Sequence, residues 1–313
     1  MNRREFISGA SAAVAYLTGC RLGRGDRSAA RYGDTLRDRC WMWGHDIGQL
    51  DRPGNQWGLP TEGQIDMPEA CRKMGVENLN VIRWGNPPVE YRRKFRGLKR
   101  LTWAICGDVH EPHSSFKEMC EYDFSLLDEM PNLIGFDMDD FFHPWDDPVT
   151  VETPEGPRKS YASVFPYRDL LALRRRMDAY GRPLDLRIVL YDSLLERGEL
   201  MVPCANLATT ATFWVWKGPD LLRLEEIFAK YRSFLPEKPT FLGVYLWDFG
   251  NSRPMKLEYL KHELEVGLGL WHRGEIEGFV FLATSVCNKN LETVEFVRNW
   301  LAVHGAEVRG AVR

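Results

Sequence analysis

The sequence predicts a single (β/α)8 barrel, because an eightfold alternation of strand-like and helix-like segments runs through a chain of suitable length. The chain has 313 residues, and one such barrel typically uses about 250. Hydrophobic residues make up 44% of the chain, which provides material for a large core. Short apolar segments rich in β-branched and aromatic residues alternate with amphipathic segments of helical period, as in successive βα units of a parallel sheet. Eight units of this kind favour a closed barrel.

Each predicted strand is an apolar segment followed by one predicted helix. The strands, in chain order, are Cys40–Asp46, Leu79–Gly85, Leu101–Asp108, Leu133–Asp140, Leu184–Asp192, Thr210–Trp216, Phe241–Asp248 and Phe279–Ser285. The helices are Met67–Met74, Val89–Leu98, Ser115–Met130, Tyr167–Tyr180, Leu194–Met201, Asp220–Phe234, Lys256–Arg273 and Leu291–His304. An open doubly wound sheet is the competing topology, but the chain has no Gly-x-Gly-x-x-Gly turn after the first strand and no P-loop pattern. The barrel is therefore the preferred fold.

The amino-terminal segment predicts export and lipidation. Residues 1–20 begin with a charged pair, Arg3-Arg4, continue through a short apolar stretch and end at Cys20. Arg3-Arg4 resembles the twin-arginine signal, and Leu17-Thr18-Gly19-Cys20 resembles the bacterial lipobox, in which the cysteine is lipidated. An amphipathic helix ending in a buried cysteine is the alternative. We expect an export signal over 1–20, a flexible tether over 21–38, one barrel domain over 39–313, and a periplasmic or cell-surface lipoprotein.

Charge and cysteine content argue against a nucleic-acid partner and against a zinc cluster. Lys and Arg total 41, Asp and Glu total 44, and neither sign forms a long run, so the chain lacks the basic surface that nucleic acid requires. Six cysteines remain after Cys20, none in a CxxC pair, so a zinc cluster is not expected and most should be buried. The oligomeric state is left open.

Polar and aromatic residues gather at the carboxyl ends of the predicted strands. In a (β/α)8 barrel these ends meet at one mouth, where the chemistry takes place. Hydroxyl or carboxylate groups of a sugar could bind polar side chains here, and tryptophan rings could stack on its apolar faces. The candidate substrate-binding residues are His45, Asp46, Arg83, Asp108, Asp140, Tyr191, Asp192, Trp216 and Trp247.

The fourth predicted strand carries the strongest candidates for catalysis. Strand alternation places Asp137 and Asp139 on the face opposite Phe136 and Met138, so both carboxylates should point into the barrel, about 6–7 Å apart. Such a pair would keep one carboxyl protonated and able to act as a general acid. Asp248 ends the seventh strand across the mouth. We expect Asp139 to be the acid, Asp248 the nucleophile or base, and Asp137 and Asp140 supporting carboxylates.

An exported barrel with acidic residues after strands four and seven, and tryptophans around its mouth, resembles the large clan of (β/α)8 glycoside hydrolases. The resemblance covers residues 40–305 and implies an oligosaccharide or glycoside as substrate and no cofactor. The clan usually has glutamate after strand four, often as Asn-Glu, where this chain has Asp-Met-Asp-Asp. The long segment Phe142–Arg168 after this strand is expected to form a substrate wall or a lid.

Two other functions use the same mouth. His45, Asp46, Asp108, Asp139, Asp140 and His143 are residue types that could gather around a divalent metal, as in barrel hydrolases and sugar isomerases. No His-x-His or His-Glu-x-x-His signature supports this metal site. The third hypothesis is a lipid-anchored carbohydrate-binding protein without turnover.

Overall fold

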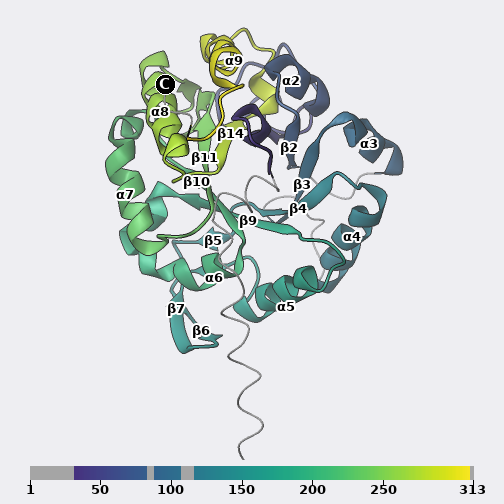
Figure 1. Cartoon of the computed structure of the whole chain (residues 1–313), viewed down its shortest axis with the longest axis vertical. Coiled ribbons are helices and arrows are strands. Elements are labelled where there is room, and N and C mark those ends of the chain that lie inside the picture. Colours follow the sequence, from purple (N-terminus) through teal and green to yellow (C-terminus); the bar gives the residue numbers. More distant parts are fainter. Residues whose placement is uncertain (1–31, 83–87, 107–115, 311–313) are drawn as a thin grey trace, which may run out of the picture.

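The fold is a closed barrel of eight parallel strands surrounded by helices, as the sequence predicts (Figure 1). The computed structural model describes residues 32–82, 88–106 and 116–310. Around the barrel the strand order is β1-β14-β11-β10-β9-β4-β3-β2. The barrel strands are β1 (Cys40–Gly44), β2 (Asn78–Val81), β3 (Arg100–Cys106), β4 (Leu133–Met138), β9 (Asp185–Tyr191), β10 (Thr210–Trp214), β11 (Thr240–Tyr245) and β14 (Gly278–Leu282).

The helices occupy the intervals between these strands. They are α2 (Met67–Met74), α3 (Val89–Arg93), α4 (Phe116–Glu129), α5 (Tyr167–Asp178), α6 (Val202–Leu207), α7 (Leu224–Phe234), α8 (Leu257–His272) and α9 (Glu292–His304). Short 3-10 helices lie at η1 (Arg37–Arg39), η2 (Lys94–Gly97), η3 (Asp192–Leu200), η4 (Gly218–Arg223), η5 (Phe249–Asn251) and η6 (Thr284–Val286). Within the described ranges, no helix is long and apolar enough to cross a membrane.

All eight predicted strands overlap a barrel strand, but most end earlier than predicted. β4 stops at Met138, and Asp140 has a φ of 42°, so the backbone leaves the extended conformation there. The predicted helix Leu194–Met201 is wrong: the chain forms η3, in which Arg197 has non-helical angles, and the α-helix begins only at Val202. Pro203 in its first turn favours this start, because proline lacks the N–H that a helix interior needs.

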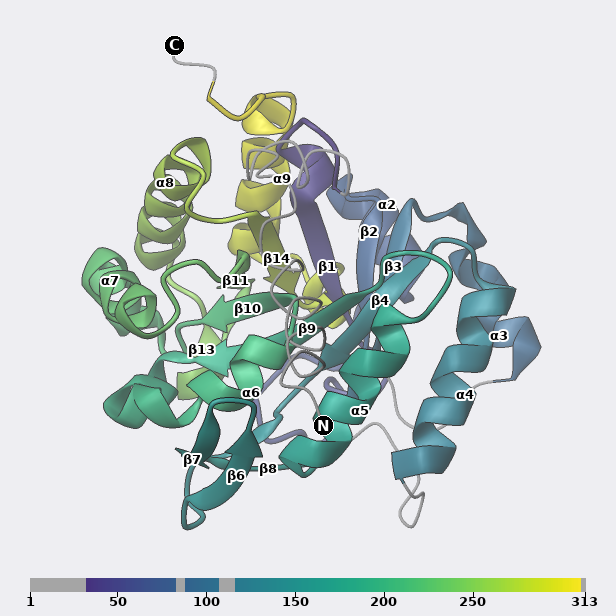
Figure 2. The ribbon, with the colours of Figure 1, turned by 60° about the horizontal axis from the view of Figure 1, so that its bottom comes forward.

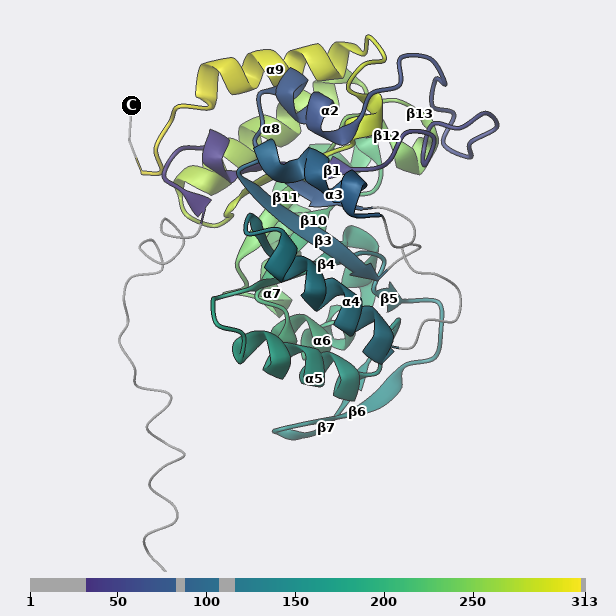
Figure 3. The ribbon, with the colours of Figure 1, turned by 90° about the vertical axis from the view of Figure 1, so that its right-hand side faces the viewer.

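Three small two-stranded antiparallel sheets were not predicted. β5 (Phe142–His143) pairs with β8 (Ala162–Ser163), β6 (Val149–Thr153) with β7 (Gly156–Ser160), and β12 (Trp247–Asp248) with β13 (Arg253–Pro254). The β6–β7 hairpin projects from the body below α6 (Figure 2). β5 and the β12–β13 hairpin lie at the same side of the barrel, the side toward which β3 and β4 point (Figure 3).

The expected tether over 21–38 is corrected in its second half. Tyr32 is 3% exposed, Leu36 is fully buried, and Thr35 bridges Val308. The phenol of Tyr32 donates to Asp185 Oδ2 at 2.6 Å, at the first residue of β9. The folded domain therefore includes residues 32–38, which close the amino-terminal end of the barrel, whereas residues 21–31 lie outside the described ranges.

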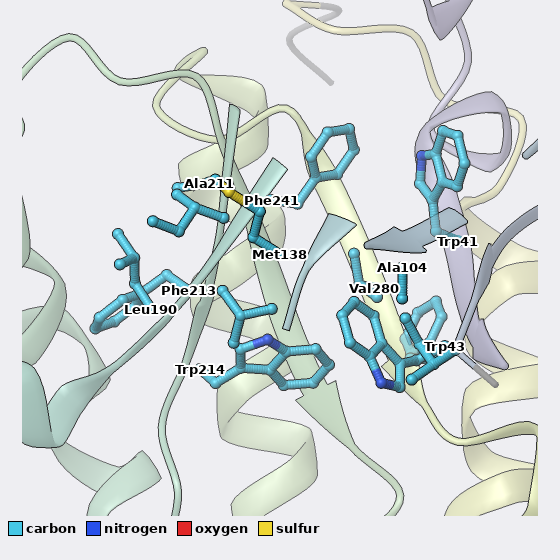
Figure 4. Packing of buried hydrophobic residues seen from close by; sticks show 14 of the residues in the cluster. Trp41, Trp43, Ala104, Met138, Leu190, Ala211, Phe213, Trp214, Phe241 and Val280 are labelled. Atoms are coloured by element: carbon cyan, nitrogen blue, oxygen red, sulfur yellow. The ribbon is translucent and has the colours of Figure 1, made fainter. Parts of the chain in front are cut away.

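Buried side chains fill the interior of the barrel. Trp41, Trp43, Trp214 and Phe241 belong to this buried core (Figure 4). The indoles of Trp43 and Trp214 meet edge to face, with centroids 5.7 Å apart. All six cysteines of the described ranges are buried and free, as expected for small hydrophobic residues.

Candidate active site

A cavity of about 1080 Å³ lies at the carboxyl end of the barrel strands. Its floor consists of apolar side chains from inside the barrel, namely Trp43, Ile82, Val189, Trp214 and Leu282. Its walls come from residues 49–57 after β1, residues 139–145 after β4, and the ends of β9, β10 and β11. The predicted wall-forming segment Phe142–Arg168 does contribute, through Phe142, His143, Pro144, Trp145 and Val164.

The floor depends on a glycine in the seventh barrel strand. A Cβ atom at Gly243 would lie 2.1 Å from the indole of Trp214, far closer than two carbon atoms can approach. The missing side chain thus provides the space in which Trp214 lies flat inside the barrel. Gly243 of β11 in this way fixes the shape of the cavity.

Asp139 and Asp140 are the acidic residues that line the cavity within the described ranges. Asp139 follows β4 directly and is partly buried, and its Oδ1 accepts the backbone N–H of Asp140 at 3.1 Å. Tyr191, at the end of β9, donates its phenol proton to Asp140 Oδ1 at 2.8 Å. Burial raises the pKa of Tyr191 well above its ordinary value, with added effects of Tyr245 and the two aspartates. Tyr191 therefore stays protonated and orients Asp140.

Tyr245 brings a second phenol to the cavity, at the end of β11. It is 2% exposed, and burial followed by the charges of Asp140 and Asp139 raises its pKa well above the ordinary value. Its position could have been predicted, because strand alternation places Tyr245 on the same face as Phe241 and Gly243. This face points into the barrel.

Trp216 lines the cavity as predicted and is held in place by Asp192. Asp192 Oδ1 accepts the backbone N–H of Trp216 at 3.1 Å, and burial raises the pKa of this carboxyl. The indole meets Trp57, Tyr191 and Tyr245 edge to face, with centroids 5.9, 6.0 and 5.7 Å apart. Asp192 does not itself line the cavity, so its role is to position Trp216.

His45 also lines the cavity, and its imidazole is neutral. Its residue exposure is 7%, and burial lowers its pKa to about 3. Nδ1 of this ring has no hydrogen-bond partner among the described residues. Such an unpaired buried polar atom costs stability, because its hydration is lost without a replacement hydrogen bond.

Asp137 points into the barrel as predicted, but it lies deeper than the cavity. It is 1% exposed. Its carboxylate accepts hydrogen bonds from Asn80 Nδ2 at 3.1 and 3.2 Å and from the hydroxyl of Thr102. Arg187 is its neighbour across the β4–β9 pair. Burial raises its pKa, and the positive charge of Arg187 opposes that rise. Arg187 is itself bonded through Nε to Asp185 Oδ2 at 3.0 Å. Asp137 thus belongs to a polar network inside the barrel.

Asp248 does not line the cavity either. Its carboxylate is 1% exposed and accepts hydrogen bonds from the backbone N–H of Gly218 at 3.2 Å and from Asn251 Nδ2 at 3.0 and 2.9 Å. Arg253 Nε lies 3.4 Å away on the facing strand β13. These contacts tie the turn after β11 to the start of η4, so the structure gives Asp248 a role in holding loops.

Two further candidates lie near the mouth without lining the cavity. Trp247 is 3% exposed, and its Nε1 donates to the carbonyl of Trp57 at 2.9 Å. Asp46 accepts a hydrogen bond from the phenol of Tyr91 and lies 3.9 Å from Lys94 Nζ. Arg83, Asp108 and Cys20 lie outside the described residues.

Strand periodicity gave no signal for Arg52 and Trp57, two cavity residues of the loop after β1. Neither residue follows a barrel strand directly. For the metal hypothesis, no group of three or more His, Cys, Asp or Glu in the described ranges could hold a metal ion.

Comparison with known proteins adds information on the fold. No protein-family model matches the sequence, and no curated protein matches it. The chain is similar in structure to a Bacteroides thetaiotaomicron protein assigned as an alpha-L-fucosidase, with a TM-score of 0.51 and 9% identity over 88% of this chain and 97% of that chain.

Two other similar structures are a β-glucuronidase from Ruminococcus gnavus and a family 18 chitinase from Crocus vernus. The first has a TM-score of 0.47 and 11% identity over 77% of this chain and 42% of the glucuronidase. The second has a TM-score of 0.44 and 9% identity over 83% of this chain and 99% of the chitinase. At these identities the similarities concern the fold, which is a (β/α)8 barrel like those of glycoside hydrolases.

Proposed function

We propose that this protein is a glycoside hydrolase that binds its substrate in the cavity at the mouth of the barrel. The observation that carries the proposal is the lining of this cavity, which combines Asp139 and Asp140 with indole and phenol rings. Aromatic rings bind the apolar faces of sugars, and carboxyl groups supply the acid and base that glycoside hydrolysis needs.

Asp139 is the proposed general acid. In its protonated form it donates a proton to the glycosidic oxygen as the bond to the sugar carbon breaks. Asp140, oriented by the Tyr191 phenol at 2.8 Å, takes a proton from the water that attacks this carbon. Asp140 replaces Asp248 in this scheme, because the carboxylate of Asp248 is occupied by Gly218, Asn251 and Arg253.

The remaining cavity groups bind and orient the sugar. The neutral His45 ring forms part of the cavity wall against which the sugar lies. Trp216 offers a ring face fixed by Asp192. The phenol of Tyr245 stays protonated, since its pKa is raised by burial, and donates to a sugar oxygen. This reaction needs no cofactor.

A non-catalytic carbohydrate-binding protein is the second candidate function. It is favoured by one observation, namely that the expected second catalytic carboxylate, Asp248, is buried among loop contacts. In that case the cavity would bind sugar through the same rings and hydroxyl partners without cleaving it.

The test is sugar release by the mature protein from a panel of oligosaccharides and aryl glycosides, with and without a chelator. We expect product in both conditions, a loss of about 10²-fold or more in kcat for Asp139→Asn and Asp140→Asn, and an unchanged kcat for folded Asp248→Asn. Binding without product would support the second candidate. Activity that the chelator abolishes and a divalent ion restores would support a metal-dependent enzyme instead.

We also propose that the protein is exported and attached to a membrane through a lipid on Cys20, as a periplasmic or cell-surface lipoprotein. The support is the order of Arg3-Arg4, the apolar stretch and Leu17-Thr18-Gly19-Cys20. Mass spectrometry of the membrane-bound protein should find a lipidated Cys20, and Cys20→Ser should release the protein from the membrane fraction. An unmodified amino terminus would contradict the proposal.

A further inference from the structure

We infer that the cavity has an outer sugar-binding site formed by Trp145, so that the substrate is an oligosaccharide chain rather than a single glycosyl unit. The inference rests on the proposed function and adds the substrate class. It starts from the exposure of Trp145, which is 82% and the highest among the large hydrophobic residues of the described ranges. The other exposed large hydrophobics there are Ile, Val and Leu residues.

Trp145 lies on the rim of the cavity and not at an arbitrary surface position. It lines the same cavity as Trp216 and Tyr245, but Tyr245 is 2% exposed and Trp216 is partly buried. Aromatic rings therefore occur at two depths, one set within the mouth and one at its edge. An indole as exposed as that of Trp145 is suited to stack on the apolar face of a sugar.

The turn that carries Trp145 is held in a defined conformation. The backbone N–H of Asp146 donates to the carbonyl of His143 at 3.2 Å, closing a β-turn with Pro144 and Trp145 as its central residues. His143 Nδ1 also lies 3.6 Å from Asp146 Oδ2. Because the turn is already ordered, stacking a sugar on Trp145 would cost little conformational entropy.

The base of this turn is fixed to the barrel. β5 pairs with β8 on either side of the protruding hairpin, and Val164 N–H donates to the carbonyl of Phe141 at 2.9 Å. The rings of Phe142 and Tyr161 pack with centroids 5.7 Å apart. Trp145 thus lies on a segment that is paired with β8 at its base and that follows Asp139 and Asp140 directly in the chain.

The size of the cavity fits more than one sugar ring. Its volume of about 1080 Å³ slightly exceeds the range of about 300–1000 Å³ that is typical for drug-sized ligands. A single hexose is smaller than such ligands and would leave the outer part unfilled. A chain with one ring near Trp216 and the next toward Trp145 would use both sets of aromatic residues.

The experiment is a chain-length series measured by calorimetry with catalytically silenced Asp139→Asn protein as the background. The probes are methyl glycosides and the matching di-, tri- and tetrasaccharides of the cello-, xylo-, manno- and chito-series. We expect tighter binding with increasing length, a loss of about tenfold for the longer chains in Trp145→Ala, and unchanged binding of the methyl glycoside. Trp145→Phe should restore part of the gain.

Leu222→Ala is the matched control, because Leu222 is 53% exposed and does not line the cavity. It should leave every affinity unchanged. Equal binding of short and long sugars, or a length effect that survives in Trp145→Ala, would overturn the outer site and leave the proposed function intact. If no sugar of any length binds to the wild-type protein, the proposed function and the outer site both fail.

Discussion

The loop after β1 that forms one wall of the cavity should depend on a single buried ion pair. Lys289 Nζ donates to Asp51 Oδ2 at 2.8 Å and to the carbonyl of Glu62 at 2.9 Å, and the two charged side chains are 0% and 1% exposed. Asp51 Oδ1 accepts the N–H of Gly48 at 2.9 Å. Lys289 therefore joins two points of this loop to the segment after β14.

We expect Lys289→Met to lower the free energy of unfolding by about 3–5 kcal/mol, because it leaves the buried Asp51 carboxylate with Gly48 N–H as its one hydrogen-bond donor among the described residues. The double variant Asp51→Leu/Lys289→Met removes both charges and should cost less, about 1–3 kcal/mol for the unpaired groups of Gly48 and Glu62. The wall loop carries Trp57, so sugar affinity should fall in the single variant as well.

The assay is urea denaturation at neutral pH, followed by tryptophan fluorescence and far-ultraviolet circular dichroism, with coincident transitions as the criterion for two states. A loss below about 1 kcal/mol for Lys289→Met would refute the argument, since it would mean that the buried carboxylate needs no partner. A double variant less stable than Lys289→Met would refute it too.

Three further predictions concern the interior of the barrel. Burial lowers the pKa of His45 to about 3 from an ordinary 6.5. Between these two pH values the unfolded chain binds a proton at His45 and the folded protein does not, so the free energy of unfolding decreases as the pH falls from 6.5 toward 3. Wild-type stability should therefore fall more steeply than that of His45→Gln below about pH 6.5, by up to about 1.4 kcal/mol per pH unit. Denaturation curves at stepped pH check this, and equal slopes would contradict it. Gly243→Ala should cost about 1–3 kcal/mol by displacing the Trp214 indole, and a crystal structure of the variant should show that ring moved; an unmoved ring would be the opposing result. Arg187→Leu should cost about 3–5 kcal/mol, because the carboxylate of Asp185 stays buried without its cation; a melting temperature equal to that of the wild type would count against the buried pair.

The order of strands and helices could be predicted from local sequence. Apolar segments of period two and amphipathic segments of period 3.6 differ at the level of a few residues, and eight such pairs leave few alternatives to a barrel. The places where prediction failed are local breaks that periodicity does not register. Arg197 interrupts a helix in this way, and the positive φ of Asp140 ends a strand two residues early.

The candidate site was predictable only in part, as two aspartates illustrate. Asp139 and Asp248 each follow an apolar segment, so the sequence treats them alike. Asp139 lines the cavity, whereas the turn after β11 carries Asp248 to the N–H of Gly218 and the amide of Asn251. The direction of a side chain beyond a strand depends on where the following loop packs, and that packing involves partners distant in the sequence.

The sequence by itself determined the fold class and the concentration of polar residues at one end of the barrel, including Asp139, Tyr191 and Trp216. These features follow from periodicity and from the common direction of parallel strands. The tertiary structure alone decided which groups meet. Tyr32 reaches Asp185 across 153 positions, and Lys289 holds Asp51 across 238. Such pairs are set by the closure of the whole barrel, and no local pattern encodes them.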